Sequence, residues 1–189
     1  MVGRPISELR VGEQAEASRS VTSSIVDEFV DAVGDHNPLH SDVEYARGTP
    51  FGKPIAPGIW TAGLISGVIG VQLPGPGSLY ISQSLSFLKP VFIGDTITAR
   101  VEIAELVPDR NRARLTTVCL NQDGQEVLRG EAWVKPPKSR IEYATAPATD
   151  SARSFDAIAT PWAAVSPWMW GLTAMKLWSD VALRMVGPA

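Results

Sequence analysis

Residues 57–71 constrain the fold more than any other part of this sequence, because they carry no charged side chain. Almost all are apolar or small, and a helix that is apolar on every side has to be buried. Four of them are glycines: Gly58, Gly63, Gly67 and Gly70. Glycine weakens a helix by about 1 kcal/mol relative to alanine, so we expect these positions to allow close approach of a sheet or ligand. The run is too short to cross a bilayer comfortably and predicts a central buried helix.

Four later segments have the pattern of β-strands, and turn residues separate them. They are residues 79–87, 96–106, 113–121 and 126–134. Short turns such as Asp123-Gly124 join the last three, which predicts an antiparallel meander. Antiparallel strands that curl around one helix form an α+β architecture.

An amphipathic helix is predicted before the buried run, over residues 18–34. Its apolar residues recur at helical spacing, Ser24 precedes Asp27 by three residues as a capping signal, and Gly34 ends it. Residues 36–53 and Pro54 beyond them are interrupted by prolines and glycines, which predicts a loop or a set of single turns.

The composition excludes some classes of protein. With 44% hydrophobic and 20% charged residues the chain has ordinary globular usage. A net charge of −3 and the lack of any basic run argue against nucleic acid as a partner. The single cysteine, Cys119, lies between apolar neighbours and predicts a buried strand residue. It cannot form an intramolecular disulfide, and residues 1–14 lack the apolar stretch of a secretory signal, so we expect a cytoplasmic protein.

Both histidines of the chain lie within five residues of each other. They are His36 and His40, flanked by Asp35 and Asn37. Histidine exchanges a proton near neutral pH, and a neighbouring carboxylate supplies a base or orients the imidazole. Two alternatives are a metal site and a polar turn, but Pro38 disfavours the continuous helix that would place both histidines on one face. We favour acid-base catalysis by Asp35 and His40 without a metal or cofactor, and we interpret His36 as a turn residue.

Several motifs together resemble the MaoC-like hydratases, and most closely the short (R)-specific enoyl-CoA hydratases that feed polyhydroxyalkanoate (PHA) synthesis. The resemblance spans roughly residues 5–137. It rests on Asp35-x-Asn37-Pro38-x-His40, Phe51-x-x-Pro54-Ile55-x-x-Gly58, Ser66, Leu73-Pro74-Gly75 and Ser86-Phe87-x-x-Pro90-Val91-x-x-Gly94-Asp95.

This resemblance implies a hotdog fold, an acyl-CoA substrate and a homodimer with active sites near the subunit interface. It assigns the catalytic water to Asp35 and His40, and the thioester oxygen to the backbone N–H of Gly58. Asn37 and Ser66 are the further candidates for substrate binding. Ser66 has a structural alternative, because a hydroxyl within a buried helix can bond to its own backbone.

The chemistry is consistent with these roles. Attack of water at C3 of a 2-enoyl thioester moves negative charge onto the thioester oxygen, which an N–H at a helix N-terminus can stabilise. The chain departs from the family at Pro57, where a histidine is usual before the glycine. Proline cannot donate a side-chain hydrogen bond, so the resemblance does not define the shape of the oxyanion site at this position.

The sequence predicts three regions: a hotdog domain over residues 1–137, a linker over 138–152 and a tryptophan-rich amphipathic helical tail over 153–189. The tail contains four of the six tryptophans, and residues 157–175 carry no charge. It is expected to pack on the domain or its dimer mate, or to dock on a partner or a hydrophobic body such as a PHA granule. Prolines within it argue against a membrane span.

The leading functional hypothesis is (R)-specific hydration of trans-2-enoyl-CoA to (R)-3-hydroxyacyl-CoA. One alternative is a dehydratase that acts on acyl-carrier-protein thioesters, or on branched or dicarboxylic acyl-CoA. Another is a non-catalytic hotdog protein that binds acyl thioesters or coats granules. A hotdog thioesterase is disfavoured, because residues 55–73 hold no acidic side chain.

Overall fold

A computed structural model describes residues 1–144 of the chain. Most of the predicted linker and the whole predicted tail helix lie outside these residues. Among the described residues, no helix is both long and apolar enough to span a membrane.

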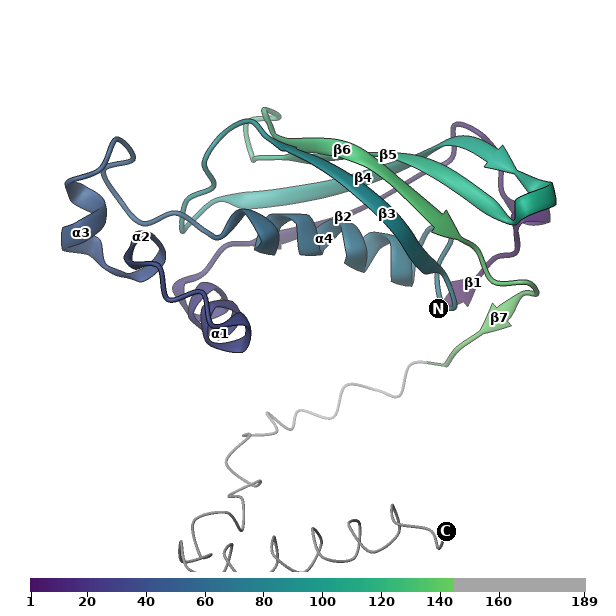
Figure 1. Cartoon of the computed structure of the whole chain (residues 1–189), viewed down its shortest axis with the longest axis horizontal. Helices are drawn as coiled ribbons and strands as arrows, with labels where there is room; N and C mark the ends of the chain where they lie inside the picture. Colours follow the sequence, from purple (N-terminus) through teal and green to yellow (C-terminus); the bar gives the residue numbers. More distant parts are fainter. Residues whose placement is uncertain (145–189) are drawn as a thin grey trace, which may run out of the picture. The chain divides into compact units, whose positions relative to one another are not determined.

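Five antiparallel strands form one curved sheet, which covers the central helix α4 (Gly58–Val71) from one side (Figure 1). In sheet order they are β2 (Gln14–Ser20), β4 (Thr96–Val107), β5 (Arg112–Leu120), β6 (Glu126–Lys135) and β3 (Leu79–Phe87). The four predicted strands are confirmed to within one residue at each end. The predicted meander is β4-β5-β6, in which consecutive strands pair antiparallel.

Helix α4 is buried on one face only. Its buried residues pack under the sheet: Trp60, Thr61, Ile65, Val68 and Ile69. On the opposite face Ile59 is 60% exposed, so the expectation of burial on every side is not met within one chain. The sheet covers a single side of the helix, and no other described element covers the second.

The glycines of α4 differ in their surroundings. A Cβ on Gly58 would lie 2.7 Å from the ring of Phe87, so close approach is confirmed there. At Gly63, Gly67 and Gly70 an added Cβ would meet no described atom within 4 Å. These three glycines therefore lie beside open space in the described part of the chain, and close packing does not explain them there.

Helix α1 (Ser23–Val33) is shorter than predicted, because residues 18–20 belong to β2. Its N-cap is Thr22, whose hydroxyl accepts a 3.2 Å hydrogen bond from the Ile25 N–H. The predicted capping residue, Ser24, lies inside the helix and donates instead to Glu28. Gly34 ends the helix as expected, in a left-handed conformation with φ of 73°.

The segment predicted as single turns contains two short helices, α2 (Pro38–Ser41) and α3 (Val43–Arg47). They lie at the left-hand end of the molecule in Figure 1, and α1 lies below that end of the sheet. At the other end β1 (Val2–Gly3) pairs antiparallel with β7 (Ile141–Glu142), a strand within the segment predicted as linker. Two 3-10 turns complete the described elements, η1 (Ile6–Glu8) and η2 (Pro108–Arg110).

Cys119 is fully buried in β5, as its apolar neighbours predict. Burial raises the pKa of its thiol to about 12, so the group stays protonated at physiological pH. It acts as a core residue.

Candidate active site

Asp35 follows directly after the left-handed turn at Gly34, and its N–H donates to the carbonyl of Val30 at 3.1 Å. This second bond to the end of α1 fixes the direction in which the chain leaves the helix. The Asp35 side chain is 46% exposed. A carboxylate just beyond a helix C-terminus lies where the helix dipole disfavours negative charge, so stability alone does not explain its position.

His40 lies on α2, which begins at Pro38. The side-chain Oδ1 of Asn37 caps this helix by accepting a 3.1 Å hydrogen bond from the Leu39 N–H. His40 is buried, and its Nδ1 lies 2.8 Å from the carbonyl oxygen of Ile55. Because a carbonyl only accepts, Nδ1 carries a hydrogen, and in the neutral ring Nε2 is left with a lone pair.

The two candidate catalytic side chains are brought together. His40 Nε2 lies 3.5 Å from Asp35 Oδ2, which is longer than a direct hydrogen bond. With a neutral imidazole, both atoms are acceptors. A water molecule that donates one hydrogen to each of them satisfies both and turns its oxygen lone pairs outward.

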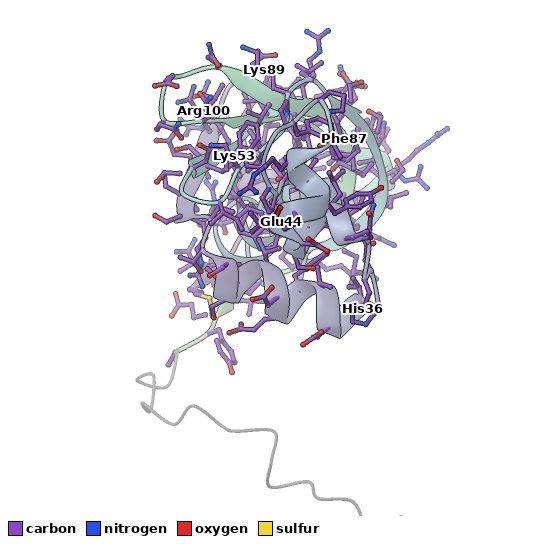
Figure 2. All side chains as sticks on the ribbon, turned by 90° about the vertical axis from the view of Figure 1, so that its left-hand side faces the viewer. His36, Glu44, Lys53, Phe87, Lys89 and Arg100 are labelled. Carbon is purple, nitrogen blue, oxygen red and sulfur yellow. The ribbon has the colours of Figure 1, made fainter. Side chains whose placement is uncertain are left out.

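His36 has a different environment from His40. Its side chain is 70% exposed, and its Nδ1 lies 4.0 Å from Asp31, which is itself 79% exposed. Figure 2 looks onto this end of the molecule and shows His36 at the periphery, well separated from Phe87 and Lys89. Among the described residues, no third histidine, cysteine or acid joins either pair to form a metal site.

Two backbone contacts connect the Asp35–His40 pair to the start of α4. The Ile55 N–H donates to the Leu39 carbonyl at 3.2 Å, while the Ile55 carbonyl accepts from His40. The next residue, Ala56, donates to the Val91 carbonyl at 2.8 Å and so ties this segment to the loop after β3. These bonds attach the pair to Ile55, which lies three residues before Gly58 along the chain.

The N-terminus of α4 has no side-chain cap, in contrast to α1, α2 and α3. Those helices are capped by Thr22, Asn37 and Asp42, whereas the N-cap of α4 is Pro57. The first N–H groups of a helix have no partner within the helix, and proline supplies none. The N–H at Gly58 is therefore available to a ligand, at the positive end of a 14-residue helix.

A cavity of 460 Å³ lies beside this helix terminus. Its walls are mostly apolar, with one lysine among them: Phe51, Ile55, Ala56, Gly58, Ile59, Thr61, Phe87, Leu88, Lys89, Pro90, Val91 and Val127. Asp35 and His40 do not line it themselves. Ile55 connects the two side chains to the cavity, because it lines the cavity and its carbonyl binds His40.

The other predicted site residues are placed differently. Asn37 makes a structural contact as the cap of α2. Ser66 lies on the exposed face of α4 and does not line the cavity. Sequence reasoning missed two features: the Ile55 carbonyl, which has no sequence signal because any residue carries one, and Thr61, a polar residue visible within the uncharged run.

Comparison with known proteins gives the family of the chain. Residues 8–122 match the family described as the MaoC like domain. The chain is 50% identical over 131 residues to a 3-hydroxybutyryl-CoA dehydratase of Methylorubrum extorquens. The aligned region covers 69% of this chain and 83% of the relative. It is 46% identical over 129 residues to an (R)-specific enoyl-CoA hydratase of Aeromonas caviae, covering 68% and 96%.

Solved structures agree. The R-hydratase PhaJ1 of Pseudomonas aeruginosa, in its unliganded form, superimposes with a TM-score of 0.71 at 38% identity, covering 77% of this chain and 95% of that one. An (R)-hydratase of A. caviae involved in PHA biosynthesis gives a TM-score of 0.67 at 45% identity, covering 69% and 98%. The chain belongs to the MaoC-like hydratase family and has its hotdog fold.

Proposed function

We propose that the protein catalyses (R)-specific hydration of trans-2-enoyl-CoA to (R)-3-hydroxyacyl-CoA. The observation that carries this proposal is the Asp35–His40 pair, with His40 Nδ1 bound to the Ile55 carbonyl and Nε2 directed at the carboxylate. That the protein is a hydro-lyase follows from relatives with 40–50% identity, which are named (R)-specific enoyl-CoA hydratase or 3-hydroxybutyryl-CoA dehydratase.

In this mechanism, the water held by Asp35 and His40 attacks C3 of the enoyl thioester. Asp35 takes one proton from the water as the new C–O bond forms. The unprotonated Nε2 of His40 can receive that proton and return it to C2 on the same face. The elements of water are thereby added with no net change in the protonation of the pair.

Gly58 supplies the electrostatic part of the mechanism. As the C–O bond forms, electrons of the double bond move toward the thioester oxygen, which becomes enolate-like. The uncapped N–H at the start of α4 donates to that oxygen, and one such donor contributes about 3 kcal/mol to transition-state stabilisation. Asn37 and Ser66 remain proposed substrate contacts, the first through its amide nitrogen and the second through its hydroxyl.

The reaction is tested by adding crotonyl-CoA and longer 2-enoyl-CoA esters and following the loss of enoyl-thioester absorbance. Hydration of at least one chain length is expected. A protein inactive at every chain length would refute the proposal and leave the carrier-protein dehydratase and the non-catalytic hotdog protein. The same assay with carrier-protein thioesters tests the second candidate, a 3-hydroxyacyl dehydratase, which is motivated by a mitochondrial relative of that name from Solanum lycopersicum at 34% identity.

A homodimer is part of the proposal, supported by two uncovered apolar surfaces. β3 pairs only with β6 among the described strands, and its exposed large apolar residues are Leu79, Tyr80, Ile81 and Phe87. Helix α4 also leaves its glycine-containing face uncovered in the described part of the chain. An apolar strand edge is a template for pairing with another chain. Because Gly58 and Phe87 lie at the ends of these two elements, the active site would be close to such an interface.

Lysines on this edge are expected to separate the subunits. Leu79→Lys combined with Ile81→Lys would place charge on a strand edge that otherwise pairs, so light scattering should give the mass of one chain instead of two. Val43→Lys is the matched control, because Val43 is also an exposed apolar residue, 52% accessible, but lies on α3. A double variant that keeps the mass of the parent protein would place the interface elsewhere.

Supply of PHA monomers in the cytoplasm, with docking on PHA granules through residues 153–189, is the most specific part of the proposal. Its support is the tryptophan content of that segment and the stated role of the A. caviae hydratase in PHA biosynthesis. Deletion of residues 150–189 should release the protein from the granule fraction while its specific activity stays within about twofold, since the deleted residues lie beyond the family match. Unchanged fractionation would contradict granule docking.

A further inference from the structure

Thr61 carries a hydroxyl that the described fold leaves without a partner. The residue is 2% exposed, and its Oγ1 makes no hydrogen bond to any described atom. Buried polar atoms are nearly always bonded, and an unpaired one destabilises the fold. Valine has almost the same shape and would remove the free-energy cost of the unpaired hydroxyl. The presence of a hydroxyl at this position therefore indicates a ligand that accepts its hydrogen bond.

The position of Thr61 indicates which ligand. It lies on α4 three residues after Gly58, and both residues line the same cavity. Residues three apart share a helix face, and helical side chains lean toward the N-terminus of their helix. The Thr61 hydroxyl is therefore displaced from its own Cα toward the turn that begins with Gly58.

No described atom accepts a hydrogen bond from this hydroxyl. The neighbouring cavity walls are formed by apolar side chains such as Ala56, Val91 and Val127. The two other buried side-chain atoms without a partner, on Ser78 and Gln83, belong to residues that do not line the cavity. In the fold without a ligand the hydroxyl oxygen is fully covered, so bulk water does not reach it, and a ligand in the cavity reaches it after rotation of the Thr61 side chain about its Cα–Cβ bond. A polar atom of a molecule bound in the cavity is the partner that remains.

We propose that Thr61 is a catalytic residue whose hydroxyl donates a second hydrogen bond to the thioester oxygen, beside the N–H of Gly58. This inference rests on the proposed hydratase function and deepens it. No proton is transferred in this step, since the hydroxyl only donates to the oxygen as it gains negative charge. A donor in an apolar, water-poor setting interacts more strongly with that charge than the same group in water.

The test compares three variants with the parent protein in crotonyl-CoA hydration. Thr61→Val and Thr61→Ala both remove the hydroxyl, the first at nearly constant shape, whereas Thr61→Ser keeps it. Removal of one oxyanion donor typically lowers kcat by 10²–10³-fold. We expect that loss in the valine and alanine variants, with little change in KM and with kcat largely retained by serine. Because the hydroxyl is unpaired without substrate, the valine variant should unfold at the same or a higher temperature than the parent.

Thr117→Val is the matched control. Thr117 is equally buried, but its hydroxyl accepts a 3.1 Å hydrogen bond from Gln83. This control should lose stability and keep its kcat. A loss of less than about tenfold in kcat for either Thr61→Val or Thr61→Ala, or an equal loss in Thr61→Ser, would overturn the role of Thr61, because a hydroxyl that bonds only to its own helix would give that result. Failure of the parent protein to hydrate any enoyl-CoA would instead refute the proposed function itself.

Discussion

Asp35→Asn is expected to lower kcat for crotonyl-CoA hydration by about 10²–10⁴-fold, the range typical for loss of a general base. Asparagine keeps the shape of the side chain but cannot take a proton from water. His40→Ala should lose activity to a similar extent, because it removes both Nε2 and the Nδ1 hydrogen bond to Ile55. The two losses should not add in the double variant, since both residues act on one water molecule.

Stability separates this catalytic role from a structural one. Asp35 follows the C-terminus of α1, where a negative charge is disfavoured by about 0.3–1 kcal/mol. The Asp35→Asn variant should therefore have a melting temperature equal to or above that of the parent while it loses activity. Calorimetry and the absorbance assay on the same preparation give both values.

The second Asp/His pair of the chain supplies the control for these variants. Asp31 and His36 are 4.0 Å apart but largely exposed, and His36 makes no contact to the start of α4. Asp31→Asn and His36→Ala should each keep kcat within about twofold. Full activity in Asp35→Asn, or an equal loss in Asp31→Asn, would contradict the assignment of the catalytic pair.

Gly130→Ala is expected to lower the free energy of unfolding by about 3 kcal/mol, near the upper end of the usual range for overpacking. Gly130 lies on β6 opposite Leu85 of β3, and an added Cβ would overlap the carbonyl oxygen of Ser84 and lie 2.8 Å from its carbon. Both are backbone atoms, so no side chain can rotate away. The strands would have to separate, and the hydrogen bonds between β3 and β6 would weaken.

Urea denaturation of the Gly130 variant is best compared with Gly48→Ala. An added Cβ at Gly48 would meet only the Tyr45 carbonyl oxygen, at an ordinary 3.5 Å, and the φ of Gly48 is −78°. That variant should stay within about 0.5 kcal/mol of the parent. Equal urea midpoints for the two variants would contradict the close pairing of β3 and β6 at Gly130.

The strands after α4 could be predicted closely because each signal is local. Alternating side chains and turn residues such as Gly94 and Gly124, both with positive φ, determine where strands begin and end. The start of α1 was less predictable, because Thr22 and Ser24 are both good capping residues and because the pairing of residues 18–20 with β4 depends on tertiary structure. The pairing of β1 with β7 joins segments some 140 residues apart and leaves no local signal.

The candidate site was predictable where its residues are neighbours in sequence. Asp35 and His40 are five residues apart, and the turn between them brings their side chains to 3.5 Å. The Ile55 carbonyl, which fixes the tautomer of His40, is a backbone atom supplied by tertiary structure. The exposed face of α4 was also unpredictable, because an uncharged sequence does not distinguish burial under a sheet from burial against a second chain.

The configuration of the product shows whether the protein is an (R)-specific hydratase. Crotonyl-CoA is incubated with the protein until its enoyl absorbance has fallen, and the 3-hydroxybutyryl-CoA formed is resolved by chiral chromatography. The parent protein is expected to form the (R) enantiomer, and Asp35→Asn is expected to form none. Formation of the (S) enantiomer, or no loss of absorbance, would contradict (R)-specific hydration.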